Sequence, residues 1–150
     1  MKRKKILFVC TGNTCRSPMA EALLRSKIKK NKIKWWDVAS CGIRAEVGSP
    51  ISFNSEVVLR EVGIKVNKFS STQLTQKKIN ASTLVVCMTE NQRQILEDCG
   101  NVYSIKELCG YEVPDPYGYD IEVYRRTRDA LSAACDWLIE NYIKKYVDEV

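Results

Sequence analysis

The sequence predicts an α/β fold, a single domain over residues 1–150 in which helices cover both faces of a parallel sheet. Short apolar runs of strand length alternate along the chain with segments whose apolar residues recur at helical spacing. The runs are apolar at consecutive positions, which is typical of parallel strands buried on both faces. With 150 residues, of which 45% are hydrophobic, the chain has the size and composition of one domain with its own core.

The first strand and the first helix are predicted on either side of a polar turn. Residues 6–10 form a continuous apolar run, as expected for a buried strand. Ser17 suits the N-cap of the next helix, and Pro18 suits its first turn. The helix is indicated by apolar residues at helical spacing, namely Ala20, Leu23, Leu24 and Ile28. The basic stretch 27–34 ends this helix and solvates its end.

A second strand and a second helix follow. Residues 35–40 have the pattern of a strand, which Gly42 ends. Pro50 opens a segment with a helical pattern, which Gly63 ends. The apolar residues that indicate this helix are Val57, Val58, Leu59 and Val62.

The rest of the chain repeats the alternation. Residues 84–88 form a third buried strand, residues 91–99 a helix and residues 102–105 a short last strand. Residues 120–146 carry a long helical pattern through Val123, Thr127, Leu131, Ala134 and Leu138. In such sheets ligands bind at the carboxyl ends of the strands, which is where residues 10–17 leave the first strand.

The composition excludes several classes of function. The chain has no histidine, which excludes Ser-His-Asp and Cys-His catalysis and His-ligated zinc. Its seven cysteines include no C-x-x-C pair, no secretory signal precedes them, and no apolar stretch reaches about 18 residues. We therefore expect free thiols, no metal, no membrane contact and a cytoplasmic location. The net charge of +6 comes without interleaved aromatic residues, so we expect a solvated surface rather than a nucleic-acid site.

The turn over residues 10–18 has the residues of an anion site. Cys10 is followed six positions later by Arg16, a spacing that Cys87 and Arg93 repeat. The second pair lacks a glycine between its members, and we interpret it as a buried strand cysteine with an unrelated helix arginine. The first pair encloses Gly12 and Asn13, which tolerate left-handed backbone and allow successive N–H groups to converge as a nest.

The same turn supplies the other parts that phosphate chemistry requires. Arg16 offers a planar fork for two phosphate oxygens, and the helix that follows adds its positive N-terminal end. These donors also stabilise a thiolate at Cys10, so the nucleophile needs no histidine. The Ser17 hydroxyl can donate a hydrogen bond to that thiolate. Far along the chain, Asp115 is held between two prolines that stiffen its loop.

Four segments resemble the low-molecular-weight protein tyrosine phosphatases. The turn at 10–18 with Met19-Ala20-Glu21 is similar to the signature loop of that family, and 115–118 to its general-acid loop. Residues 40–42 and 87–89 are similar as well. The resemblance implies a doubly wound four-stranded parallel sheet with a phosphate-binding loop after the first strand, and no cofactor. It also implies phosphorylated proteins as partners, inorganic phosphate as product, and a monomer or weak dimer.

The resemblance assigns a role to each matching residue. It implies that Cys10 is the nucleophile that becomes a cysteinyl phosphate and that Arg16 clamps the phosphate. It implies that Asp115 protonates the leaving group and then activates water. Ser17 tunes the thiolate, and the backbone cradle is formed by Thr11, Gly12, Asn13, Thr14 and Cys15. Cys15 is expected to trap an oxidised Cys10 as a disulfide; a small core residue is the alternative.

The substrate is left open between two phosphorylated residues. Thr14 stands where most phosphotyrosine enzymes of this family have isoleucine, and threonine resembles the bacterial branch that acts on phosphoarginine. Residues 43–49 also lack an aromatic residue. Tyr117, in contrast, supplies an aromatic wall suited to phenyl phosphates. We expect phosphotyrosine first, on the breadth of the family, and phosphoarginine second; arsenate reductase and a non-catalytic anion-binding module are more distant alternatives.

Overall fold

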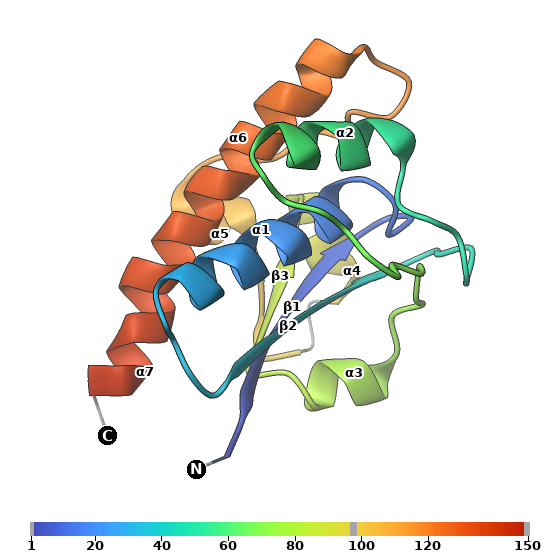
Figure 1. Ribbon diagram of the computed structural model, residues 1–150. Helices are drawn as coiled ribbons and strands as arrows, with labels where there is room; N and C mark the ends of the chain where they lie inside the picture. Colours follow the sequence, from blue (N-terminus) through green and yellow to red (C-terminus); the bar gives the residue numbers. More distant parts are fainter. Residues whose placement is uncertain (1, 97–98, 149–150) are drawn as a thin grey trace.

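The computed structural model, which describes residues 2–96 and 99–148, contains a four-stranded parallel sheet (Figure 1). Its strands are β1 (Lys4–Cys10), β2 (Trp36–Gly42), β3 (Leu84–Cys87) and β4 (Val102–Ser104), in the order β2-β1-β3-β4. The chain therefore starts in the middle of the sheet, builds outward to β2, and then returns past β1 to the other side. This doubly wound topology confirms the predicted fold class.

Helices cover both faces of the sheet. They are α1 (Arg16–Lys30), α2 (Phe53–Glu61), α3 (Gln76–Asn80), α4 (Glu90–Ile95), α5 (Ile105–Cys109) and α6 (Ile121–Leu138), which continues through the π-helical η1 (Ile139–Ile143) into α7 (Lys144–Asp148). In Figure 1, α1, α2 and α6 lie together on one side of the sheet and α3 on the other. No helix within the described ranges is both long and apolar enough to cross a membrane.

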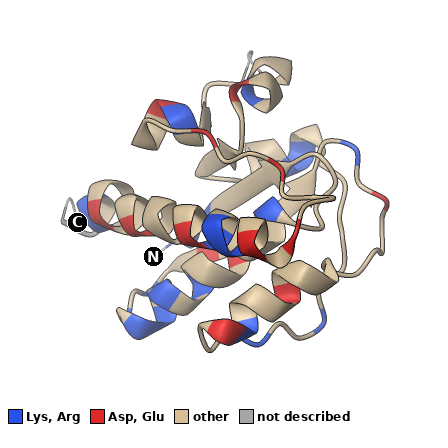
Figure 2. Cartoon of the chain, turned by 90° about the horizontal axis from the view of Figure 1, so that it is seen from above, with Lys and Arg blue, Asp and Glu red and all other residues tan. Residues whose placement is uncertain are grey.

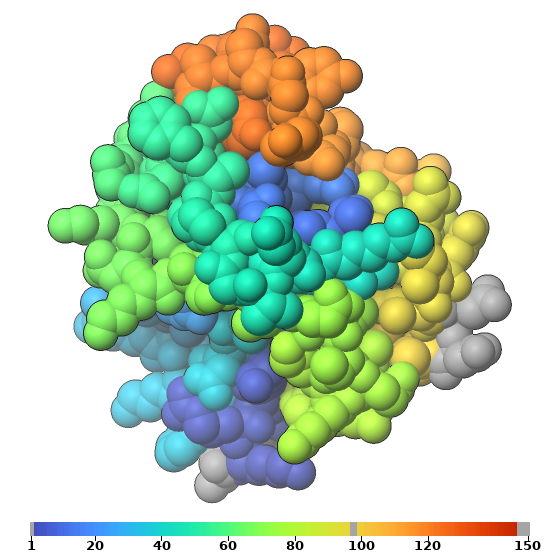
Figure 3. Space-filling view, turned by 90° about the vertical axis from the view of Figure 1, so that its right-hand side faces the viewer, coloured from blue at the N-terminus to red at the C-terminus, as the bar shows by residue number. Residues whose placement is uncertain are grey.

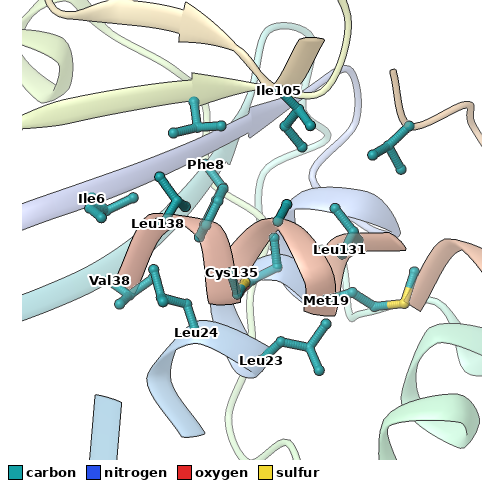
Figure 4. Close-up of a cluster of buried hydrophobic side chains, with 14 of the residues drawn as sticks. Ile6, Phe8, Met19, Leu23, Leu24, Val38, Ile105, Leu131, Cys135 and Leu138 are labelled. Carbon is teal, nitrogen blue, oxygen red and sulfur yellow. The ribbon is translucent and has the colours of Figure 1, made fainter. Parts of the chain in front are cut away.

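Successive side chains of β1 pack into two separate hydrophobic cores, one on each face of the sheet. Ile6 and Phe8 point toward α1 and α6, where they meet Leu24 and Leu138 (Figure 4). Leu7 and Val9 point to the opposite face and join the smaller core under α3 and α4. Since side chains alternate across a strand, only a continuously apolar segment can serve both cores. This explains why the first strand has no polar residue between Ile6 and Val9.

The first helix begins earlier than the sequence predicts. It starts at Arg16, with Cys15 at the N-cap position and no side-chain cap, whereas Ser17 was the predicted cap. The Ser17 hydroxyl is instead drawn into buried contacts with Cys10 and Asn13. Pro18 is thus the third helical residue, which is tolerated because N–H groups of the first turn have no intrahelical partner. The uncapped N–H groups of this turn remain free to face an anion.

Several other helices begin or end at residues other than those predicted, because capping residues determine where a helix begins. The helix after Pro50 begins only at Phe53, where Ser52 caps it, and the predicted helix 91–99 spans Glu90–Ile95 after a capping box at Thr89. Residues 97–98 of that prediction lie outside the described part of the chain. Ser104 caps α5, so Ile105 opens a helix instead of ending a strand. Helices α3 and α5, with five residues each, are too short to give a periodic signal in the sequence.

Candidate active site

The candidate site lies at the carboxyl end of β1, where residues 11–15 connect the strand to α1. In Figure 3 this segment, in lighter blue, lies at the bottom of a hollow on the molecular surface. The rim consists of the orange segment before α6, the teal segment between β2 and α2, and the yellow region around α4. Segments from the whole length of the chain thus converge on the predicted phosphate loop.

Cys10 is surrounded by hydrogen-bond donors. Its sulfur lies 2.8 Å from the Ser17 hydroxyl and accepts a hydrogen bond from the Asn13 backbone N–H at 3.3 Å. The side chain is buried at the end of β1, directly before the N-terminus of α1. Donors and a helix N-terminus are the features that stabilise a thiolate. The contact between Ser17 and Cys10 is the one expected from the sequence.

Asn13 holds the shape of the loop. It adopts a left-handed conformation with φ of 58°, which turns its N–H toward the Cys10 sulfur. Its side-chain amide donates to the hydroxyl oxygens of Ser17 at 2.8 Å and Ser40 at 2.9 Å. Its side-chain carbonyl oxygen, Oδ1, accepts a hydrogen bond from the Thr72 N–H at 2.9 Å. Every hydrogen-bonding group of this fully buried side chain is therefore used, which fixes the loop from three parts of the chain.

Gly12 does not adopt the left-handed conformation that the sequence suggested for it, because Asn13 alone makes the turn. The glycine that the loop requires is Gly42, at the end of β2. A Cβ atom there would lie 2.6 Å from the Thr11 carbonyl oxygen and 3.0 Å from the Asn13 nitrogen. Both contacts are with backbone, so neither can yield easily. The sequence pattern marks Gly42 as the end of a strand and as part of the family resemblance, but it gives no sign of this close approach to the loop.

Arg16 and Asp115 form an ion pair at the end of the loop. The Arg16 guanidinium is 5% exposed and donates to the Val113 carbonyl oxygen at 3.0 Å. Its Nη2 atom lies 3.7 Å from Oδ2 of Asp115, whose side chain is 52% exposed. The other carboxylate oxygen of Asp115 accepts from the Tyr117 N–H at 3.1 Å, a local turn that orients it. A buried guanidinium suited to clamp phosphate thus lies next to a carboxyl group that is open to solvent.

The remaining predicted loop residues have distinct surroundings. The Thr11 hydroxyl accepts from the Gln92 side chain at 3.2 Å, which joins the loop to α4. The sulfur of buried Cys15 lies 3.7 Å from the Tyr124 hydroxyl. The Thr14 hydroxyl has one partner within the described chain, that same sulfur at 3.8 Å. It is otherwise free to bond a ligand.

Tyr117 is not packed against the loop. Its side chain is 75% exposed, so it stands at the rim of the hollow and forms no wall in this conformation. The sequence expectation of an aromatic wall at this position would require the tyrosine to turn inward onto a substrate.

The second Cys and Arg pair of the sequence has none of these features. Cys87 is fully buried in β3, and burial raises the pKa of its thiol to about 12. Arg93 lies on α4, where its Nε is 3.4 Å from a carboxylate oxygen of Glu107. The thiol is therefore protonated at neutral pH and the guanidinium is already paired. This agrees with the interpretation of that pair as unrelated residues.

The arrangement around Cys10 suits transfer of a phosphoryl group. It combines a sulfur nucleophile, a converging set of N–H donors, a buried guanidinium and an accessible carboxyl group. Within residues 2–96 and 99–148, no group of three or more Cys, Asp or Glu residues could hold a metal ion. The chemistry that these side chains can perform is nucleophilic attack on a phosphate, with proton transfer by Asp115.

Comparison with known proteins gives the family. The family model described as low molecular weight phosphotyrosine protein phosphatase matches residues 5–148. A protein-arginine-phosphatase of Geobacillus stearothermophilus is 39% identical over 91% of this chain and 94% of its own length. The solved structure of an arginine phosphatase from that organism gives a TM-score of 0.88 at 35% identity, covering 98% of this chain and 97% of the other.

A tyrosine phosphatase structure is almost as similar. The low molecular weight protein tyrosine phosphatase from T. tengcongensis gives a TM-score of 0.86 at 37% identity, covering 91% of this chain and 98% of the other. The resemblance stated from the sequence is thereby confirmed, including its arginine-phosphatase branch. The chain belongs to the low molecular weight phosphotyrosine protein phosphatase family, and it is a hydrolase of this type.

Proposed function

We propose that this protein hydrolyses phosphorylated proteins in two steps through Cys10. In the first step the Cys10 thiolate attacks phosphorus, the bond to the leaving group breaks, and Asp115 gives its proton to that group. In the second step the Asp115 carboxylate takes a proton from water, which attacks the cysteinyl phosphate and releases inorganic phosphate. The observation that carries the proposal is the Cys10 sulfur held between the Ser17 hydroxyl and the Asn13 N–H, in a loop that Arg16 and Asp115 flank.

The other loop residues bind the phosphate in this proposal. Arg16 holds two of its oxygens and stabilises the charge that spreads over them in the transition state. The N–H groups of residues 11–15 and of the first turn of α1 cradle the same oxygens. Ser17 stabilises sulfur when it is the nucleophile and again when it is the leaving group of the second step. Because these groups already have their positions fixed by buried contacts, little reorganisation accompanies the reaction.

Phosphoarginine is the substrate residue that the site supports best. The Thr14 hydroxyl lacks a nitrogen or oxygen partner in the described chain, so it can accept a hydrogen bond from a guanidine N–H. An isoleucine side chain at this position would offer no such acceptor. The relative in Geobacillus stearothermophilus, a protein-arginine-phosphatase, supports the same assignment. We therefore place phosphoarginine ahead of phosphotyrosine, which reverses the order expected from the sequence.

Thr14 can be tested by removing its hydroxyl with little change in volume. We predict that Thr14→Val lowers kcat/KM for a phosphoarginine peptide about 10–200-fold and leaves kcat/KM for the matched phosphotyrosine peptide unchanged or higher. Thr14→Ser, which keeps a hydroxyl, is the control and should retain most of the phosphoarginine activity. If both activities fall in proportion in Thr14→Val, the hydroxyl only supports the loop and does not select the substrate.

Phosphotyrosine is the second candidate, favoured by the family and by one feature of the site. Tyr117 follows Asp115 by two residues and is exposed, so it can turn onto an aromatic leaving group. Arsenate reduction has less support, because it needs a relay of two further accessible cysteines. Cys87 is fully buried with a pKa of about 12, which makes it a poor member of such a relay.

A further inference from the structure

A second feature of the molecule lies away from the catalytic loop, along the open edge of the sheet. A groove of about 1090 Å³ runs beside the edge strand β2. It is bordered by α1, by the connection between α2 and α3, and by α3 itself. In Figure 1 that connection, in green, passes back beside β2 on its way to α3. Neither Cys10, Arg16 nor Asp115 lines this groove.

The lining of the groove is strongly positive. Its lining contains seven Lys and Arg residues and one Glu, a net charge of +6. The whole chain has 24 Lys and Arg and 18 Asp and Glu, also a net charge of +6. The 17 basic and 17 acidic residues elsewhere therefore balance. The solvated basic surface expected from the sequence thus includes this groove, whose lining is strongly positive.

Most of the positive charges in the groove have no carboxylate within ion-pair distance among the described residues. The single acidic residue, Glu21, is paired with Arg25 at 2.8 Å. The other six cations form no ion pair with any residue in the described ranges: Lys5, Lys29, Lys65, Lys68, Lys77 and Lys78. Elsewhere on the surface, cations such as Lys27, Arg125 and Lys144 do have such partners. Figure 2 shows the end of α1 in blue, where Lys29 of the groove lies beside Lys27 and Lys30.

The arrangement of the lysines favours an extended ligand over a compact one. A phosphate site needs donors that converge on one point, as the loop after β1 provides. The groove lysines instead come from four separate segments: β1, α1, the connection after α2, and α3. Apolar side chains such as Leu7, Val38 and Ile64 lie between them. Charge distributed along a partly apolar groove fits a chain that presents carboxylates at intervals.

The composition of the lining argues against a nucleic acid. Single-stranded nucleic acids are held by aromatic side chains that stack on bases, together with arginines that contact the backbone. The lining contains one aromatic residue, Phe69, and one arginine, Arg25, which Glu21 already pairs. Lysines are strongly hydrated point charges, suited to exposed carboxylates that keep part of their own hydration. An acidic polypeptide is the ligand that these features fit.

We propose that this groove docks an acidic, extended segment of the phosphoprotein substrates. That the docked proteins are substrates rests on the proposed function. The binding of an acidic segment to the groove does not depend on it. Docking at a second site raises the effective concentration of the phosphorylated residue near Cys10, which lowers KM for substrates that carry such a segment. Substrates without it gain nothing. Attraction by the groove also speeds encounter at low ionic strength.

Direct binding tests the groove without any phosphatase activity. The probe is a fluorescein-labelled, unphosphorylated peptide of alternating glutamate and alanine, followed by fluorescence anisotropy. We expect saturable, salt-sensitive binding that weakens about tenfold or more in the triple variant Lys29→Glu, Lys65→Glu, Lys77→Glu. The control triple variant, Lys34→Glu, Lys106→Glu, Lys145→Glu, makes the same charge change at exposed lysines outside the groove and should bind nearly as the parent does.

Two outcomes would overturn the docking proposal. If peptide binding weakens equally in both triple variants, it depends on the net charge of the protein and not on the groove. Tighter binding of a single-stranded oligonucleotide or of inorganic polyphosphate, with loss in the groove variant alone, would assign the groove to a different polyanion.

Turnover separates this proposal from the catalytic one. The groove variant should have the same kcat/KM as the parent for p-nitrophenyl phosphate. For a phosphopeptide with an acidic extension its kcat/KM should fall, because KM rises. A parent protein that does not hydrolyse p-nitrophenyl phosphate would contradict the proposed function, whereas the result of the peptide-binding experiment would still hold. A groove variant with an unchanged KM for the acidic phosphopeptide would refute the role in substrate docking.

Discussion

At the scale of single residues, the surroundings of the cysteines distinguish Cys10 from the others. All seven cysteines are free thiols, and five of them are buried. Burial raises the pKa of Cys41 and of Cys87 to about 12, so both are protonated at neutral pH. Cys10 is buried as well, but it is held by a hydroxyl, a backbone N–H and the start of α1. The same residue type is inert in one place and a candidate nucleophile in another because of these donors.

The role of Asp115 can be tested through the leaving group. We predict that Asp115→Asn slows the first step most for phosphate esters of weakly acidic alcohols, because those leaving groups need a proton. An aryl phosphate with a strongly acidic phenol should be affected far less in that step. The measurement is the slope of log kcat/KM against leaving-group pKa for parent and variant. An identical loss across the whole series would mean that Asp115 does not act as the acid.

Oxidation tests the predicted partnership of Cys15 with Cys10. Peroxide should convert the Cys10 thiol to a sulfenic acid, which condenses with the Cys15 thiol to a disulfide and water. We expect the parent to lose activity and to recover it with a thiol reductant. The Cys15→Ser variant should recover much less, because its oxidised Cys10 proceeds to sulfinic acid. A mass spectrum of peroxide-treated parent without a Cys10–Cys15 disulfide would refute the pairing.

At the scale of elements, the sequence predicts the strands well and the ends of the helices poorly. Continuous apolar runs identify the two central strands, β1 and β3, because both are buried on both faces, and shorter or mixed patterns indicate the edge strands β2 and β4. The start of α1 is decided by Ser17, whose hydroxyl bonds Cys10 instead of capping the helix. The end of β2 is decided by the approach of Gly42 to Thr11. Neither contact is visible in a local pattern, since both depend on how the loop folds back.

Gly42 gives a prediction at this scale. Gly42→Ala places a methyl group against the backbone of the catalytic loop and should destabilise the protein by roughly 1–3 kcal/mol. It should also lower kcat by about 100-fold, since displacement of the loop misplaces Cys10 and the N–H donors. Thermal unfolding and turnover of p-nitrophenyl phosphate measure the two effects.

Gly100→Ala is the matched control for this substitution. A Cβ atom at Gly100 meets no atom of the described residues within 4 Å, and its backbone is outside the left-handed region. Its stability and activity should equal those of the parent. Gly42→Ala with parental activity would show that the loop tolerates displacement at this point.

At the scale of the whole molecule, the site is assembled by long-range contacts. Asn13 bonds residues 40 and 72, Thr11 bonds Gln92, and Arg16 bonds residue 113. The sequence identifies the catalytic side chains because they cluster in one loop and one Pro-Asp-Pro segment. It does not predict the contacts of Ser40, Thr72 and Gln92 with the loop, because these polar residues reach it only through the order of the strands. The positive lining of the groove beside β2 is hidden for the same reason.

The central claim is that the phosphoryl group passes through Cys10, and trapping that intermediate tests it most directly. In Asp115→Asn, p-nitrophenyl phosphate should still phosphorylate the enzyme, because p-nitrophenol leaves without a proton. Hydrolysis should be slow, because the base that activates water is gone. Rapid quenching followed by peptide mass spectrometry should therefore find a burst of p-nitrophenol and phosphate on Cys10, and neither in the double variant Cys10→Ala with Asp115→Asn. Phosphate on another residue, or turnover that persists when Cys10 is replaced, would contradict the account.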